Sequence, residues 1–414
     1  MSSESDPNSW SLLESDPGLF SELLTDLGVK NVDVEEVWCL DDLILKSEEH
    51  TCGIIFLFKW QGGRRSSFNP ISSSSSSLSS TNSTDPVVFI KQVVQNACGT
   101  LALLHVVLNR NGVDIGETLQ GLKSFIVNMD GETAGSCLAS HEAVRIAHNS
   151  FVRPEAFSIE DEDSRHEKSG DAFHFVSFVP KNGRVYELDG LSKGPVDIGE
   201  IGSNWLITAQ NALQKRIDEY SQFEIRFNLM ILKKSTLFTT FTEAAAILAE
   251  SECLLGALLS ISSEDSSFEI PTFPTSEEVA SMFGEKILPA PPINADTLAE
   301  ASIARLLSSC PTESVRDALQ VRMKRLHTRL IKCGEIVTQE KERIAQYKKE
   351  NERRRHQFFP LILELLRGLA ERDKLKELYE RGKKRACDEK ERMRLQKLNA
   401  KAERAAEVKG ASGL

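Results

Sequence analysis

Hydrophobic and polar positions in the first half of the chain alternate in short runs that predict a mixture of helices and strands. A helix is expected to begin at Asp16 and Pro17, because Asp is suited to cap a helix and Pro fits its first position. Further helical patterns cover 118–149 and 204–221. Apolar or β-branched runs of strand length lie at 53–60, 87–94, 173–179, 184–188 and 223–232. The pattern therefore predicts one mixed helix and strand domain over about 8–232.

Two segments of this domain lack any apolar period. Residues 61–85 include a stretch, 72–83, in which nine of twelve residues are serine. Such a composition cannot bury a core, so we expect a flexible surface insertion. Residues 153–170 are polar and acidic and are too long for an ordinary connection. Loops of this length are often functional.

The second half of the chain changes in character. Residues 233–320 are interpreted as a linker with some helical pieces, because they combine Ser-rich and Pro-rich stretches with short apolar runs. From 321 to 385 the pattern is helical, and Pro360 is expected to open a second helix. That helix is too apolar for full exposure, so it packs within its own domain or in a partner's groove. A charged helical tail is expected over 386–414.

Composition and charge exclude several classes of protein. The 414 residues are 40% hydrophobic, which is enough for at least one sizeable core. No apolar run approaches the roughly 18 residues of a membrane-spanning helix, and the first residues do not resemble a secretory signal. Eight cysteines occur without a Cys-x-x-Cys pair, which argues against a zinc ribbon or a dense disulfide framework. We therefore expect a cytoplasmic and nuclear protein with reduced thiols.

The net charge of -11 is unevenly distributed. Residues 321–414 carry 27 Lys and Arg against 15 Asp and Glu, whereas the rest of the chain is strongly acidic. A basic tail on an acidic body could indicate nucleic-acid binding. The tail charges are mixed in sign, however, which is typical of a solvated helix. Neither nucleic acid nor a membrane is expected as a partner.

Cys98 is the first candidate for chemistry. It follows an expected strand and, with Asn96 as helix cap, would lie in the first turn of a helix. The partial positive charge at a helix N-terminus stabilises a thiolate there. The alternative is that Cys98 is a small buried residue, as most free cysteines are.

His174 and Asp189 are the second candidate, because a hairpin over the two strands brings them together. If residues 180–183 form a four-residue loop, His174 lies directly opposite Asp189. If Asn182-Gly183 alone forms the turn, the two residues are diagonal neighbours, with Cβ atoms about 7–8 Å apart. In either register the carboxylate could orient the imidazole toward a thiol. The alternative is an ordinary cross-strand charge pair.

Gln92 precedes Cys98 by six residues, at the end of the expected strand. Its amide could donate to a developing oxyanion beside the backbone N–H of Cys98. A glutamine at a strand end is more often only solvated. His105, His141 and His148 lie in helical patterns and are interpreted as packing or surface residues.

Three groups of residues match the motifs of a known family. They are Gln92-x-x-x-Asn96-Ala97-Cys98-x-Thr100, Asp171-Ala172-Phe173-His174-Phe175-Val176 and Tyr186-Glu187-Leu188-Asp189-Gly190-Leu191. Together with the segment from Trp10 to Phe20, the run IFLFKW and the closing EIRFNLM, they resemble the ubiquitin C-terminal hydrolases over about 10–232. The resemblance implies Cys98 as nucleophile, His174 as general base and proton donor, Asp189 as its orienting partner and Gln92 as oxyanion donor. No cofactor or metal is expected.

The same resemblance implies a fold and a set of partners. The fold would be α+β, a helix-flanked, mostly antiparallel sheet with a knotted chain path, and 153–170 would be the family's crossover loop over the active site. Residues 347–371 resemble the tail of the long, proteasome-associated branch. That likeness implies an adaptor-binding helical domain over 321–385, which binds the proteasomal ubiquitin receptor. A related domain in a chromatin-remodelling complex is the second partner implied.

The function expected is that of a cysteine protease that hydrolyses the bond after the C-terminal glycine of ubiquitin. The alternative is a scaffold that binds ubiquitin and the proteasome without turnover. A missing triad member would favour the scaffold, and none is missing. A general papain-like peptidase is disfavoured by the ubiquitin-type motifs.

Overall fold

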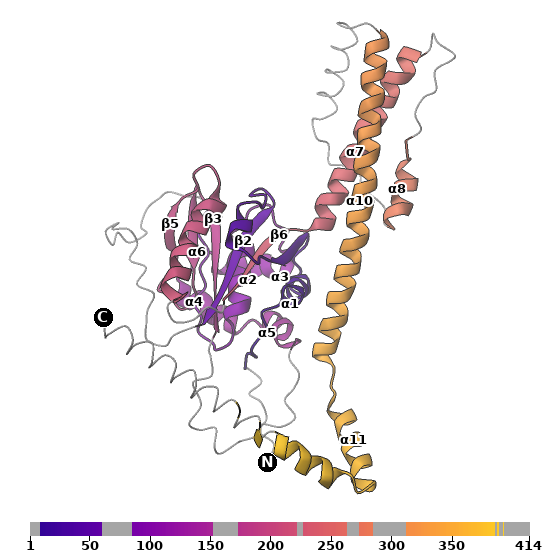
Figure 1. The fold of residues 1–414 in the computed structure, drawn as a ribbon. Helices are drawn as coiled ribbons and strands as arrows, with labels where there is room; N and C mark the ends of the chain where they lie inside the picture. Colours follow the sequence, from indigo (N-terminus) through magenta and orange to yellow (C-terminus); the bar gives the residue numbers. More distant parts are fainter. Residues whose placement is uncertain are drawn as a thin grey trace, which may run out of the picture. The chain divides into compact units, whose positions relative to one another are not determined.

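The computed structural model describes residues 9–59, 85–151, 173–221, 227–262, 273–284 and 312–385, together with 387, 388 and 392. An antiparallel sheet of six strands in the order β1-β6-β2-β3-β4-β5 lies at the centre of the first half (Figure 1). The strands are β1 (Val32–Glu36), β2 (Thr51–Lys59), β3 (Phe173–Lys181), β4 (Arg184–Leu188), β5 (Val196–Glu200) and β6 (Phe227–Lys234). The expectation of a mostly antiparallel sheet flanked by helices is confirmed.

Helices cover both faces of this sheet. One face packs against α2 (Cys98–Asn109), with α1 (Pro17–Asp26), α3 (Gly116–Ile126), α4 (Gly131–Ala139) and α5 (Glu142–Asn149) contributing to the same core. The other face packs against α6 (Trp205–Ser221) and the 3-10 helix η1 (Leu40–Leu43). Side chains of a strand alternate between faces, so Ile55 and Leu57 of β2 enter the first core and Phe56 and Phe58 the second. This explains why β2 is almost continuously apolar.

Helix α1 begins where its sequence signals place it. Asp16 is the N-cap, and its carboxylate accepts a hydrogen bond of 2.8 Å from the Leu19 N–H, while Pro17 is the first helical residue. Asp130 caps α4 in the same way. The short strands β1 and β5 were not expected, because their sequences are polar and largely acidic and carry no apolar run.

The expected strand over 87–94 is wrong. This segment is extended but belongs to no strand of the described sheet. Asn109 of α2 instead binds both the N and the O of Val88, each at 2.8 Å, and His105 Nε2 lies 3.1 Å from the N and the O of Ile90. Because two helix side chains satisfy its backbone, the segment needs no neighbouring strand.

The hairpin between β3 and β4 has the shorter of the two expected turns. Lys181 pairs with Arg184, so the turn consists of Asn182 and Gly183 alone, with φ angles of 51° and 76°. Such left-handed angles at both positions are those of a type I′ turn, which suits the twist of a hairpin. The expected four-residue loop is therefore wrong, and the diagonal register is the one observed.

The second half of the chain contains a long helical pair. Helix α7 (Thr236–Ser262) lies beside α10 (Thr312–Arg355), and both pack with α8 (Ser276–Phe283) around one apolar core (Figure 1). Residues 233–320 are thus not simply a linker, and the helical part begins at 312 rather than 321. The sequence interpretation missed α7 because Ser-rich and Pro-rich stretches follow it. This helix has an apolar face that packs against α10. No helix in the described ranges is both long and apolar enough to span a bilayer.

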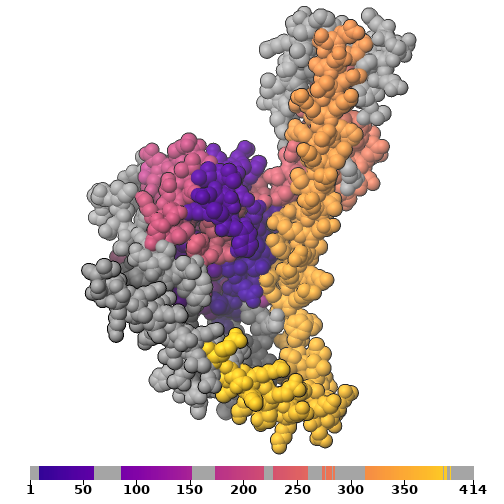
Figure 2. Space-filling model, viewed as in Figure 1, coloured from indigo at the N-terminus to yellow at the C-terminus, as the bar shows by residue number. Residues whose placement is uncertain are grey.

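The end of α10 packs against α1, so the long helix is joined to the sheet domain. In Figure 2 the orange surface of α10 meets the indigo surface of the N-terminal region. Asn351 is fully buried and donates to the carbonyl of Gly18 at 3.2 Å, and Arg354 lies 3.0 Å from Asp16. The described residues from 356 onward belong to a separate unit, which includes α11 (Phe359–Glu371). As expected, Pro360 lies in the first turn of that helix.

Candidate active site

Cys98 is the first residue of α2, and its side chain is almost fully buried. The expected cap at Asn96 is wrong by one residue, because Ala97 holds the cap position without a side-chain hydrogen bond. Asn96 instead adopts a left-handed backbone (φ 64°), and its amide donates to the carbonyl of Trp10 at 2.9 Å. Cys98 therefore lies at the N-terminal end of α2, where the helix dipole carries partial positive charge.

His174 and Asp189 are in direct contact. His174 Nε2 lies 2.7 Å from Asp189 Oδ1, although the two residues are only diagonal neighbours across the hairpin. The same carboxylate oxygen accepts a hydrogen bond of 2.9 Å from the Leu191 N–H. Because Nε2 is occupied by the carboxylate, the other ring nitrogen, Nδ1, is left for a second partner.

The electrostatics of the pair favour the charged forms of both groups. Burial lowers the pKa of His174, but its hydrogen bonds with Asp189 and with the Cys98 side chain raise that pKa to about 9. Burial raises the pKa of Asp189, but the hydrogen bond and charge of His174 lower it below its ordinary value. An imidazolium is therefore held between the Cys98 sulfur and a carboxylate at neutral pH.

Gln92 lies beside the same cluster. Its backbone N–H donates to the carbonyl of Gly190, the residue after Asp189, at 2.8 Å. Its side-chain Oε1 is buried and has no hydrogen-bond partner among the described residues. The extended segment therefore joins the turn after Asp189 to the start of α2, and it places a side-chain amide with spare hydrogen-bonding capacity there.

Phe58 is a residue of the site that sequence reasoning did not identify. It pairs with His174 across β2 and β3, and its ring meets the imidazole edge-on, with centroids 5.9 Å apart and planes at 88°. A phenylalanine in a buried strand is typical of a core residue. Only the register of β2 on β3 shows that this one contacts the imidazole.

The other expected histidines are structural, in agreement with their interpretation. His105 and His148 are fully buried, and burial lowers the pKa of each to about 4, so both are neutral. His141 caps α5 through a long contact of 3.5 Å with the Val144 N–H.

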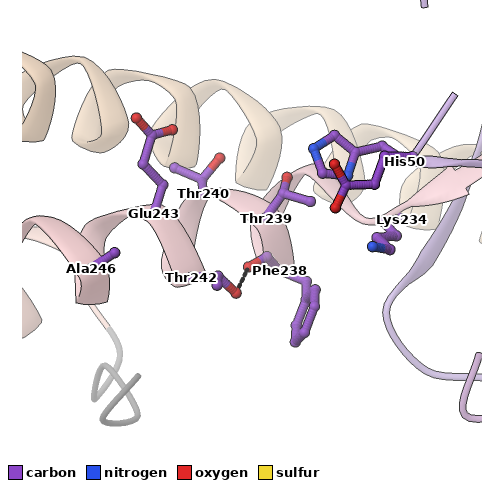
Figure 3. Close-up of a pocket in the computed structure, with 9 residues that line it drawn as sticks. His50, Lys234, Phe238, Thr239, Thr240, Thr242, Glu243 and Ala246 are labelled. Carbon is purple, nitrogen blue, oxygen red and sulfur yellow. Dashed lines mark hydrogen bonds between the residues drawn. The ribbon is translucent and has the colours of Figure 1, made fainter. Parts of the chain in front are cut away.

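A separate cavity of about 450 Å³ lies where β6 passes into α7. Figure 3 shows its lining, which includes His50, Lys234, Phe238 and Glu243. These side chains carry charges of both signs and hydroxyl groups, but none is a cysteine, and neither His174 nor Asp189 lines the cavity. This cavity therefore lies apart from the cluster of Cys98, His174 and Asp189.

Comparison with known proteins gives the family. The model "Ubiquitin carboxyl-terminal hydrolase, family 1" matches residues 10–218, and a second model, "Ubiquitin carboxyl-terminal hydrolases", matches residues 333–375. The chain is 34% identical over 380 residues to ubiquitin carboxyl-terminal hydrolase isozyme L5 of Dictyostelium discoideum, which covers 92% of this chain and 96% of that one.

Two further proteins are similar to a little over half of this chain. The chain is 38% identical over 231 residues to ubiquitin carboxyl-terminal hydrolase BAP1 of Danio rerio, covering 53% of this chain and 30% of that one. It is 35% identical to the solved structure of Trichinella spiralis UCH37 bound to ubiquitin vinyl methyl ester, over 57% of this chain and 86% of that one, with a TM-score of 0.44. Since a family model matches half of the chain and a relative matches nearly all of it, the chain belongs to family 1 of the ubiquitin carboxyl-terminal hydrolases, thiol-dependent deubiquitinating enzymes.

Proposed function

We propose that this enzyme hydrolyses the bond after the C-terminal glycine of ubiquitin, with Cys98 as its nucleophile. The observation that carries the proposal is the chain of contacts from Cys98 through His174 to Asp189. It joins a thiol at a helix N-terminus, an imidazole and an orienting carboxylate, the three groups that cysteine hydrolases require.

In the proposed reaction the resting pair is a Cys98 thiolate and a His174 imidazolium, rather than a thiol and a neutral base. The thiolate attacks the glycine carbonyl, and the oxyanion accepts hydrogen bonds from the Gln92 amide and the Cys98 N–H. The imidazolium gives its proton to the leaving amine as the carbon–nitrogen bond breaks. Neutral His174 then takes a proton from water, which attacks the thioester and releases ubiquitin and the thiolate.

The first test uses ubiquitin that carries a thiol-reactive electrophile at its C-terminus. The intact protein should gain the mass of one ubiquitin, and the Cys98→Ala variant should gain none. Cys137→Ala is the matched control, because Cys137 is a half-buried free cysteine on α4 whose sulfur contacts Met129 rather than the triad; this variant should react like the wild type. Equal labelling of the Cys98→Ala variant would refute the nucleophile, and an unlabelled wild type would favour the scaffold alternative.

A second part of the proposal concerns partners. We propose that α11 binds an adaptor domain of the proteasomal ubiquitin receptor. Helix α11 exposes five large apolar side chains, each between 42% and 58% exposed: Leu361, Ile362, Leu363, Leu365 and Leu366. A helix with an apolar face of this size is typical of a segment that lies in a partner's groove. Binding to a chromatin-remodelling complex, and a cytoplasmic and nuclear location, stay predictions.

Binding of the purified receptor adaptor domain tests this. Leu365→Asp should weaken binding at least tenfold, because it places a charge in the apolar interface. Glu364→Gln, at an exposed neighbouring position with an i,i+3 ion pair to Arg367, should change it less than twofold. Binding that is unaffected by Leu365→Asp would contradict the assignment of α11.

A further inference from the structure

A second ion pair lies beneath the candidate site and has no part in the proposed reaction. Arg216 of α6 donates through Nη2 to Oε1 of Glu187 on β4, and the two side chains are only 4% and 3% exposed. Removing two charges from water is costly unless their geometry and surroundings compensate. A fully buried pair of this kind, next to reacting groups, therefore calls for a role.

The pair reaches His174 and Asp189 along two paths. Glu187 precedes Asp189 by two residues, so both side chains lie on the same face of β4 and its continuation. The guanidinium of Arg216 lies over the ring of Phe58, 5.6 Å from its centroid, and that ring meets the edge of His174. One path supports the carboxylate and the other supports the imidazole.

Asp189 needs such support because it lies one residue beyond the paired part of strands β3 and β4. The last pair between β3 and β4 is Ser177 with Leu188, so no strand hydrogen bond fixes Asp189 itself. The pairing of Glu187 with Arg216 anchors the preceding residues of strand β4 to α6. An unpaired carboxylate at position 187 would lie close to Asp189 and repel it.

The charges around the site come from three elements. Cys98 of α2 acts on His174, and Glu187 of β4 acts on both His174 and Asp189. Arg216 of α6 and His105 of α2 act on Asp189. Arg216 helps to lower the pKa of Asp189, whereas burial raises the pKa of Glu187. Arg216 and Glu187 together add no net charge beside His174 and Asp189.

We propose that Arg216 and Glu187 are positioning residues for ubiquitin hydrolysis: their buried pair holds Phe58 and the end of β4 against His174 and Asp189 and keeps the surrounding charge balanced. The inference rests on the proposed triad. Labelling of the wild type by reactive ubiquitin tests that triad separately, so failure of one idea is distinguishable from failure of the other.

The decisive variant is Glu187→Gln in the full chain, with kcat and KM measured against pH on a fluorogenic ubiquitin C-terminal amide. The variant removes the negative charge of Glu187, which interacts favourably with the His174 imidazolium, while Arg216 keeps its positive charge. We expect kcat to fall about tenfold with KM unchanged within twofold. The alkaline limb of the kcat profile should move to lower pH by at least half a unit.

Removing both charges provides the rescue. The double variant Arg216→Met with Glu187→Gln should return the alkaline limb to its wild-type position, and it keeps the fold testable if Glu187→Gln alone is unstable. Asp197→Asn is the matched control, because Asp197 also pairs with an arginine, Arg184, but at the exposed edge of the sheet. This control should leave the limb unmoved. Loss of activity in both Glu187 variants with an unmoved limb would refute the proposal and leave a purely structural pair.

Discussion

His174 carries its proton at neutral pH because Asp189 and the Cys98 side chain both bind its ring. A histidine with an ordinary pKa near 6.5 would be mostly neutral there and would have to remove the thiol proton during attack. With a pKa of about 9, His174 is already protonated, as the proposed proton donor to the leaving group must be. The hydrogen bond of 2.7 Å to Asp189 is therefore the first contact to test.

Replacing Asp189 by Asn tests this contact. An amide nitrogen cannot accept the imidazole proton, and an amide oxygen would stabilise the imidazolium less than a carboxylate does. We expect kcat on a fluorogenic ubiquitin C-terminal amide to fall by about 10²–10⁴-fold, with little change in KM. Unchanged turnover in Asp189→Asn would show that the triad is wrong.

At the scale of elements, the contact between α1 and α10 depends on Gly18 of α1, which has no side chain. A Cβ at Gly18 would lie 2.6 Å from Cγ of Tyr347, which is closer than real Cβ atoms approach a neighbour. Charged contacts reinforce the fit, since Arg354 bridges Glu14 at 3.1 Å and Asp16 at 3.0 Å. Asp16 thereby caps α1 and binds α10 at once.

Gly18→Ala should therefore lower the free energy of unfolding by about 1–3 kcal/mol, through overpacking against the tyrosine ring. Urea denaturation measures this change in the free energy of unfolding. Gly121→Ala is the matched control, because Gly121 also lies in a helix but a Cβ there meets nothing within 4 Å; it should be neutral or stabilising by up to about 1 kcal/mol. Removing the ring with Tyr347→Ala should relieve most of the cost of Gly18→Ala, and an additive double variant would contradict the contact.

Elements were predictable where a local signal was strong. The apolar run of β2, the Asp16 cap of α1 and the Asn-Gly turn of the hairpin all act within a few residues. The segment 87–94 misled, because its apolar composition resembles a strand while its backbone partners are side chains of α2. Nothing in the local sequence distinguishes those two ways of satisfying a backbone.

At the scale of the whole molecule, two buried histidines connect segments of the sheet domain that are distant in sequence. His148 lies 2.7 Å from both Thr100 Oγ1 on α2 and the carbonyl of Ser11, so it connects α5, the nucleophile helix and the N-terminal segment. His105 connects α2 to the extended segment that carries Gln92. Both histidines make these buried contacts as neutral imidazoles.

The domain should therefore lose stability in acid. The unfolded histidines bind protons below about pH 6.5, whereas the folded ones resist until about pH 4, so the contribution is complete above 6.5 and is lost as the pH falls toward 4. Each histidine accounts for up to roughly 3 kcal/mol. Urea denaturation of the wild type and of His148→Gln should show a gap in unfolding free energy that narrows between pH 7 and 4.5. A gap independent of pH would contradict this account.

Much of the chemistry was determined by the sequence alone. Cys98 at a helix start, His174 and Asp189 on two strands of a hairpin, and the family motifs around them depend on residue type and on spacing along the chain. These are short-range properties, and a single sequence displays them.

The tertiary structure decided what depends on contacts between distant segments. It set the diagonal register that joins His174 to Asp189, the packing of Phe58 on the imidazole, the buried pair of Arg216 with Glu187, and the docking of α10 on Gly18. Burial and charge pairing arise only when the chain folds, because each depends on which residues displace water around a group. Residue types therefore indicate which groups can react, whereas the fold decides their protonation and their orientation.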